Sequence, residues 1–262
     1  MTKAKVVQAE DDSNDMSDKD RLIEELREAV RARDEFVAIA AHELRNPMTP
    51  ILMQVNMLMR SATDPGRCRP EIIAPRLERL EHAVREFVRR STILLNVSRI
   101  AAGNLQIERS EFDLSRIVRE VADRAALAAR MARSRVETDL QEDVVGVWDR
   151  LAVEQVVENL LSNALKFGAG SPVTLTLRAD DQAAQLVIRD RGIGISEADR
   201  SRIFERFERA VTQSEHGGFG VGLWLANQLI VAMGGTISIE SIPGQGATFL
   251  VGLPLRTVRT GA

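Results

Sequence analysis

Two series of mostly apolar residues, whose members recur three or four residues apart with one step of seven, constrain the fold of this chain most. The first comprises Val30, Val37, Ala41, Leu44, Met48, Ile51, Val55 and Leu58. The second comprises Ile73, Leu77, Leu80, Val84, Phe87, Ser91, Leu94 and Ser98, and it ends at Gly103. The helix-breaking sequence Asp-Pro-Gly at 64–66 separates them. This is the spacing of a coiled-coil seam, so we expect two helices joined as an antiparallel hairpin.

A single hairpin leaves half of each seam facing water, so a second copy of the chain is expected to close a four-helix bundle. Residues 21–104 would form this homodimeric domain. Leu22 and Leu26 extend the apolar pattern upstream, where a sensor partner could dock on the coiled coil. Pro47 lies inside the first helix and lacks the amide that would bond the Glu43 carbonyl, so a bend is expected there.

Composition excludes several classes of protein. Charged residues make up 28% of the chain and the net charge is −3, so no global field favours nucleic acid or an anionic membrane. The single cysteine, Cys68, excludes an internal disulfide framework and fits a reducing cytoplasm. No apolar run approaches the roughly 20 residues that cross a bilayer, so a cytoplasmic chain, or the cytoplasmic part of a membrane sensor, is expected. Residues 1–20 are acidic and polar, and we expect a disordered tail.

After Gly103 the spacing of apolar residues changes repeatedly, which indicates a second domain over residues 105–262. The pattern predicts helices over 114–131 and 151–166, with Asp149 as the N-cap of the second. It predicts strands over 173–178, 185–189, 236–241 and 247–251. Helices alternating with mostly antiparallel strands favour an α/β two-layer sandwich.

Three clusters in this second domain carry candidate chemistry. Asn159, Asn163 and Lys166 recur at helical spacing, so they share one helix face. An amide oxygen can ligate Mg²⁺ without adding charge, and a lysine suits a polyphosphate. An exposed polar helix face explains this cluster equally well.

The other two clusters are rich in glycine. Asp190 follows a strand and precedes Gly192 and Gly194, so backbone can approach a flat ligand while the carboxylate accepts a hydrogen bond from an amine. Glycines 218, 220 and 222 open a helix that runs to Met233, and the free amides and dipole of a helix N-terminus favour phosphate. Taken singly, each cluster is explained equally well by an ordinary glycine turn.

In order and spacing, these clusters resemble the ATP-binding domain of the histidine kinase, gyrase and Hsp90 superfamily, which has the Bergerat fold. Residues 159–167 are similar to its N box, 190–194 to its G1 box, Phe204 and Phe207 to its F box, 218–222 to its G2 box and 244–248 to its last glycine segment. The resemblance implies that Asp190 binds the adenine amine of ATP and that Asn163 ligates Mg²⁺. It places Asn159 and Lys166 beside the phosphates, and it implies a mobile lid over 202–217. The remaining nucleotide-binding residues implied are Phe167, Gly192, Gly194, Phe204, Phe207, Gly218, Gly220, Gly222 and Thr248.

His42 lies one position off the first seam, in a segment with the pattern His-Glu-Leu-Arg-x-Pro. This segment resembles the H box of sensor histidine kinases. The resemblance implies that His42 takes the γ-phosphate of ATP, that Glu43 orients the ring or takes its proton, and that the phosphate passes to an aspartate on the receiver domain of a separate response regulator. Asn46, one helical turn further on, would position water for hydrolysis of the phosphorylated regulator.

Two other classes of protein remain open at this point. One is a signalling scaffold whose ATP domain binds nucleotide only to set the conformation of the helices. The other is a serine kinase of the anti-sigma type, which uses the same ATP fold. The intact clusters argue against the first, and the helical hairpin with its histidine argues against the second.

Overall fold

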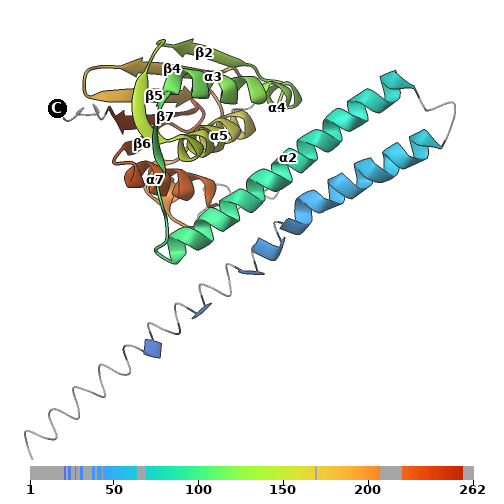
Figure 1. Ribbon diagram of the computed structural model, residues 1–262, viewed down its shortest axis with the longest axis horizontal. Coiled ribbons are helices and arrows are strands. Elements are labelled where there is room, and N and C mark those ends of the chain that lie inside the picture. Colours follow the sequence, from blue (N-terminus) through green and yellow to red (C-terminus); the bar gives the residue numbers. More distant parts are fainter. Residues whose placement is uncertain are drawn as a thin grey trace, which may run out of the picture. The chain divides into compact units, whose positions relative to one another are not determined.

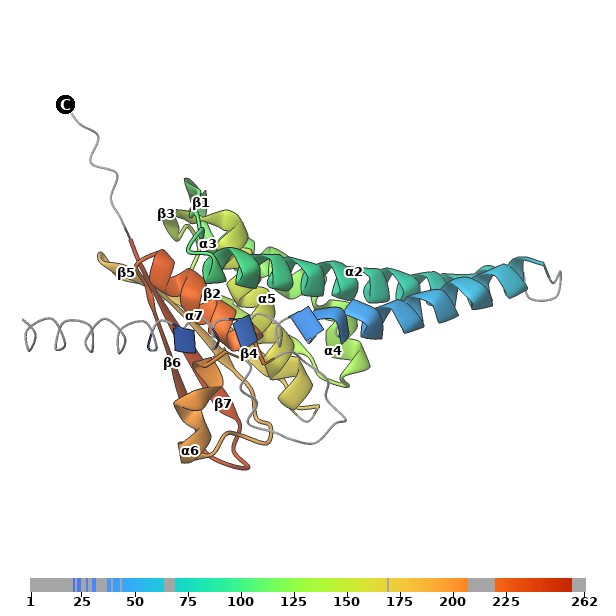
Figure 2. The same cartoon turned by 90° about the horizontal axis from the view of Figure 1, so that it is seen from below.

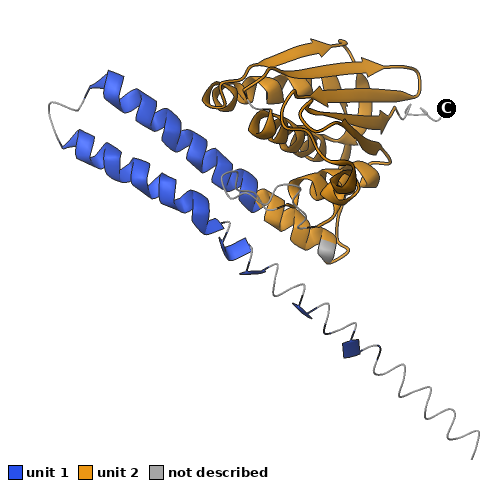
Figure 3. Ribbon diagram, turned by 180° about the vertical axis from the view of Figure 1, so that it is seen from behind, with its two compact units in different colours: residues 1–91 blue, residues 92–262 orange. Residues whose placement is uncertain are grey.

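The structure is a computed structural model of the 262-residue chain. It describes residues 21, 23–24, 27, 30–31, 37–38, 40–42, 44–63, 69–168, 170–206 and 220–255, with only the backbone at Ala101. The predicted acidic tail, the site residues Glu43, Phe207 and Gly218, and most of the predicted lid lie outside these ranges. The chain divides into two compact units, residues 1–91 and 92–262, which Figure 3 colours separately. Each unit is described by itself.

The first unit contains the predicted helical hairpin, which is confirmed (Figure 1). Residues 44–62 are helical, and α2 (Pro70–Ala101) begins in this unit and runs on into the second. Arg76 on α2 ties the two helices together because its guanidinium donates to the Met57 carbonyl at 2.9 Å and to the Ser61 hydroxyl at 2.8 Å. No helix among the described residues is long and apolar enough to cross a bilayer.

Large apolar side chains of both predicted seams remain exposed in the single chain. On the first helix, Val37, Met48 and Val55 keep more than a third of their surface exposed, and Leu77 and Val84 do the same on α2. The two helices of one hairpin therefore leave these seam positions unburied.

The second unit is an α/β two-layer sandwich, as predicted. Its main sheet has the order β2 (Val136–Leu140), β4 (Val173–Ala179), β5 (Ala183–Arg189), β7 (Ala247–Pro254), β6 (Thr236–Ser241). The β2–β4 pair is parallel and the other pairs are antiparallel. A second, two-stranded sheet pairs β1 (Arg109–Asp113) with β3 (Val145–Asp149).

Helices α3 (Leu114–Arg124), α5 (Arg150–Phe167) and α7 (Gly222–Ala232) cover one face of the main sheet (Figures 1 and 2). Alternate residues of the central strands are buried against them, as in Leu175, Leu177, Ile188 and Val251. The shorter elements are α4 (Ala126–Met131), α6 (Glu197–Arg200) and a 3₁₀ turn, η1 (Arg202–Phe204).

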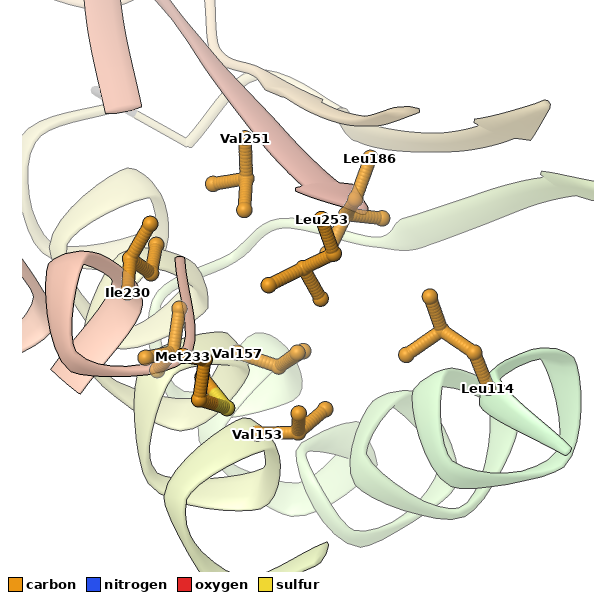
Figure 4. A pocket seen from close by; sticks show the side chains of 9 residues that line it. Leu114, Val153, Val157, Leu186, Ile230, Met233, Val251 and Leu253 are labelled. Carbon is orange, nitrogen blue, oxygen red and sulfur yellow. The ribbon is translucent and has the colours of Figure 1, made fainter. Parts of the chain in front are cut away.

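The interior between helices and sheet holds a small cavity of about 10 Å³ (Figure 4). Its lining is apolar: Leu114, Val153, Val156, Val157, Leu186, Ile230, Met233, Val251 and Leu253. A space of this size is at the lower limit for one water molecule, and nothing polar lines it. It is a gap in core packing and not a ligand site.

The sequence prediction was wrong in two places. The helix expected over 114–131 is broken at Ala125, whose amide bonds the Val121 and Ala122 carbonyls as α3 ends. Three strands were missed: β1, β2 and β3. Strand β2 lies at the sheet edge and is only five residues long, and it carries Glu137 and Asp139, residue types that are depleted in strands.

Candidate nucleotide-binding site and phosphoacceptor histidine

Helix α5 begins where the sequence indicated. Asp149 is its N-cap, and the Asp149 carboxylate accepts a hydrogen bond from the Ala152 amide at 3.0 Å. The other carboxylate oxygen accepts from the Glu108 amide at 3.0 Å. The cap fixes the start of the helix that carries Asn159, Asn163 and Lys166.

Asn159 is buried on α5, with only 2% of its surface exposed. Its amide nitrogen donates to the Gly222 carbonyl at 3.2 Å, and its amide oxygen accepts from the Gln155 side chain at 3.2 Å. Asn159 therefore joins α5 to the first residue of α7. The alternative interpretation of the cluster as a solvated polar face is wrong for this residue.

Asn163 and Lys166 are half-buried on the same helix. Within the described parts of the chain, the Asn163 amide makes no hydrogen bond, so both of its polar atoms remain available to a ligand. The Lys166 ammonium lies 4.6 Å from the centroid of the Phe167 ring, which places a positive charge at the C-terminal end of α5. No group of three or more histidine, cysteine or acidic side chains among the described residues could hold a metal ion. A cation here would need the amide and the oxygens of the bound nucleotide.

Asp190 follows β5 and is 4% exposed. Its Oδ1 accepts hydrogen bonds from the Gly192 amide at 2.8 Å and the Ala247 amide at 3.3 Å. Burial raises the pKa of this carboxyl above its ordinary value, although those two hydrogen bonds act in the opposite direction. Oδ2 receives no hydrogen bond from the described residues, so one oxygen is held in place while the other can meet a ligand.

Gly192 and Gly194 are required for the close packing of the turn after Asp190. A Cβ atom on Gly192 would lie 1.8 Å from the Phe167 carbonyl oxygen, at the end of α5. Gly194 has φ +67°, and a Cβ there would lie 2.1 Å from the Ile242 carbonyl oxygen. The turn therefore packs closely against both the end of α5 and the β6–β7 loop.

Helix α7 begins at Gly222 after a residue, Val221, whose side chain does not cap it. The first amides of this helix are therefore not satisfied by a capping side chain. Gly220, two residues earlier, has φ +66°. Gly218 lies outside the described residues.

The remaining predicted residues occupy the edges of this region. Thr248 on β7 is half-buried and pairs with Arg189 and Glu240 on the neighbouring strands, directly after the Ala247 amide that bonds Asp190. Phe204 is half-buried at the end of η1, a turn that contacts α7.

Two features of the site were missed in the sequence. Ser241 is 8% exposed; its hydroxyl donates to the Gly246 carbonyl at 2.7 Å and accepts from the Ile195 amide at 2.8 Å, which pins the turn after Asp190 to the β6–β7 loop. The Arg206 guanidinium lies 5.7 Å from the ring centroid of Trp224 on the first turn of α7, and burial lowers the pKa of Arg206. The Ser241–Ile195 and Arg206–Trp224 contacts join segments distant in sequence, so no spacing could indicate them.

His42 is exposed on the first helix of the hairpin. The amide nitrogen of Asn46 lies 3.3 Å from its Nδ1 atom, as expected for side chains one helical turn apart. The structure thus brings together two of the three predicted residues of this segment, and Glu43 is outside the described ranges.

A buried carboxylate at a strand end, a buried amide on the neighbouring helix and an uncapped helix after a glycine turn are the features expected of a nucleotide-binding α/β domain. Comparison with known families agrees. The model of the histidine kinase-, DNA gyrase B- and HSP90-like ATPases matches residues 148–257, and the model of the His Kinase A (phospho-acceptor) domain matches residues 32–103. The chain belongs to the sensor histidine kinases, of which it carries the core.

Similar proteins include two bacterial sensor kinases. The adaptive-response sensory kinase SasA of Crocosphaera subtropica is 30% identical over 88% of this chain and 62% of its own length. The alginate biosynthesis sensor protein KinB of Pseudomonas aeruginosa is 32% identical over 90% of this chain and 39% of its own length. The solved structure of the Acinetobacter baumannii histidine kinase AdeS has the same fold, with TM-score 0.56, 22% identity and coverage of 82% of this chain and 98% of that chain. This chain spans less than two thirds of the length of the two sensor kinases.

Proposed function

We propose that this chain is an ATP-dependent protein-histidine kinase that phosphorylates itself on His42 and passes the phosphate to an aspartate on the receiver domain of a separate response regulator. The observation that carries this proposal is Asp190, buried at a strand end with Oδ1 held by two backbone amides and Oδ2 left for a ligand. A carboxylate in this position suits the exocyclic amine of adenine.

The phosphates would lie at the other end of the site. The first amides of α7 and the positive end of its dipole favour them, and the Asn159–Gly222 hydrogen bond holds this helix end against α5. Lys166 would add a positive charge. The uncommitted amide of Asn163 fits an oxygen ligand of Mg²⁺, and a bound Mg²⁺ would offset the charge that develops on the transferring phosphate.

His42 would act as the nucleophile. A ring nitrogen with a lone pair forms a bond to the γ-phosphorus, the bond from that phosphorus to the β,γ-bridging oxygen breaks, and ADP leaves. Glu43 would take the ring proton. Exposure of His42 supports this role, since the nucleotide must approach the ring from solvent.

The exposed seam residues support a homodimer with a four-helix bundle at its centre. We further infer that Asn46 positions water for hydrolysis of the phosphorylated regulator, that a sensor partner docks on the coiled coil upstream of His42, and that the chain works in the cytoplasm.

Incubation with γ-labelled ATP and Mg²⁺ tests the proposal. Acid-labile, base-stable label on the parent chain that is absent from His42→Ala and retained by His82→Ala would support it. His82 is the matched control because it is the other histidine among the described helical residues. Absence of label from the parent, or its persistence in His42→Ala, would overturn the proposal.

A further inference from the structure

The contact between Asn46 and His42 bears on the chemistry of the imidazole ring. The Asn46 amide nitrogen lies 3.3 Å from His42 Nδ1, and both side chains are exposed. An amide nitrogen can only donate, so Nδ1 is the acceptor in this hydrogen bond.

A neutral imidazole carries one proton, on one of its two nitrogens. With the amide turned so that its nitrogen faces Nδ1, a neutral His42 carries its proton on Nε2. A protonated ring nitrogen has no lone pair with which to attack phosphorus, and the lone pair of Nδ1 is directed at Asn46. In this arrangement neither ring nitrogen is ready to act as a nucleophile.

The same side chain can favour the other tautomer. Rotation of the amide by about 180° presents its oxygen, which can only accept, and Nδ1 must then carry the proton. Nε2 is left with a lone pair. The two orientations of one amide therefore correspond to two forms of His42, and only the second offers Nε2 to a γ-phosphate.

We propose that Asn46 is a positioning residue for autophosphorylation, and that the orientation of its amide sets the tautomer of His42. This inference rests on the proposed kinase function. In the reactive form, the Nε2 lone pair forms the bond to the γ-phosphorus as the bond to the β,γ-bridging oxygen breaks and ADP leaves. The Asn46 oxygen holds the Nδ1 proton through this step, and that proton then passes to Glu43 or solvent.

The effect of the amide itself should be modest. Exposed side-chain pairs at this helical spacing are weak, so loss of the amide is expected to change the tautomer ratio about twofold. A carboxylate at position 46 can only accept, and its hydrogen bond is charge-assisted. Asn46→Asp is therefore expected to shift the ratio toward the Nδ1-protonated form by about fivefold.

The test is ¹⁵N NMR of the imidazole nitrogens in the full chain without nucleotide. The parent should show His42 mainly protonated at Nε2, Asn46→Ala should reduce that preference, and Asn46→Asp should reverse it. His82 is the internal control, because its nitrogen shifts should be the same in all three proteins. Unchanged tautomer ratios at His42 in both variants would overturn the inference.

Initial rates of autophosphorylation provide a second readout. Asn46→Asp should raise kcat about fivefold and leave the KM for ATP unchanged, because position 46 is not part of the nucleotide site. A structural role alone would not reverse the tautomer while preserving KM. A fall in kcat in Asn46→Asp, alongside the expected NMR shift, would also overturn the inference. The two hypotheses can fail separately. Absence of label from the parent chain would contradict the kinase function, whereas the NMR measurement, which needs no ATP, tests the tautomer by itself.

Discussion

The side-chain amide of Asn159 donates to the carbonyl oxygen of Gly222 across 3.2 Å, and so links the middle of α5 to the first residue of α7. At its C-terminal end, α5 contacts the turn that follows Asp190, because Gly192 packs on the Phe167 carbonyl. One helix therefore contacts both the adenine end and the phosphate end of the proposed site. This makes α5 the element that fixes the distance between the two ends.

Substituting the two asparagines of α5 one at a time should show that Asn159 stabilises the fold and that Asn163 binds the ligand. Asn159→Ala removes a buried amide and its hydrogen bonds with the Gly222 carbonyl and the Gln155 side chain, so the free energy of unfolding should fall by about 1–3 kcal/mol. Asn163→Ala removes an amide that bonds nothing in the described chain, so stability should change by about 0.5 kcal/mol or less. Denaturant unfolding measures both.

Nucleotide binding supplies the second half of this comparison. With Mg²⁺ present, Asn163→Ala should bind ATP at least about tenfold more weakly than the parent, whereas without the metal the two should bind alike. Equal Mg²⁺ dependence in the parent and in Asn163→Ala would contradict the role of Asn163 as a ligand.

Asp190→Asn should weaken ATP binding and raise the melting temperature. The raised pKa of Asp190 means that the folded chain favours the neutral carboxyl, and its contribution to stability is lost as pH rises through the folded-state pKa. At pH 7 the charged group is therefore a cost, and Asp190→Asn should unfold at a higher temperature while losing most of its affinity for ATP. The thermal difference should vanish as pH falls below the ordinary pKa of an aspartate. A variant that melts lower than the parent at pH 7 would contradict this.

The positions and contacts of some site residues could be predicted from the sequence, and those of others could not. Helical spacing placed Asn159, Asn163 and Lys166 on one helix face. Spacing does not show whether that face is buried, so the burial of Asn159 could not be predicted. The cap at Asp149 was predictable because its hydrogen bond to Ala152 is local.

Contacts between distant segments explain most of what sequence reasoning missed. Strand β1 pairs with β3 some 36 residues later, and its polar sequence gains a partner only in the folded chain. The Ser241–Ile195 hydrogen bond and the Arg206–Trp224 contact join segments that are distant in sequence. The glycine at position 192 was expected to let the backbone approach a ligand, and in the structure it allows the turn to pack on the Phe167 carbonyl.

Gly192→Ala should destabilise the nucleotide-binding unit by about 3 kcal/mol and abolish ATP binding, because a Cβ atom would lie 1.8 Å from the Phe167 carbonyl oxygen. Gly222→Ala is the control for stability. Its Cβ atom would meet nothing nearer than 3.9 Å, and alanine favours a helix, so unfolding should be unchanged or slightly harder. Calorimetric melting of both variants checks this, and similar melting temperatures would show that the turn can relax.

Glu86 on α2 should make the hairpin sensitive to acid. Burial raises the pKa of this carboxyl, but hydrogen bonds and charges from Arg89 and Arg90 outweigh it and lower the pKa to about 2. The stabilisation is present above the unfolded value of 4.5 and is lost as pH falls toward 2. Glu86→Gln should therefore cost on the order of 2 kcal/mol at pH 7 and nothing near pH 2. Helix melting followed by circular dichroism between these pH values measures the difference, which should close as the parent becomes protonated.

Val84→Asp should dissociate the proposed homodimer. Val84 lies on the second seam and is 41% exposed in the single chain, so the proposed interface would bury it. A two-fold axis places each side chain at the interface twice, and two carboxylates moved out of water without partners should weaken the dimer by about 100-fold or more. Val231→Asp is the control, because Val231 is 59% exposed on α7, a helix that carries neither seam. Sedimentation velocity should show a monomer only for Val84→Asp, and a dimer that survives the substitution would place the interface elsewhere.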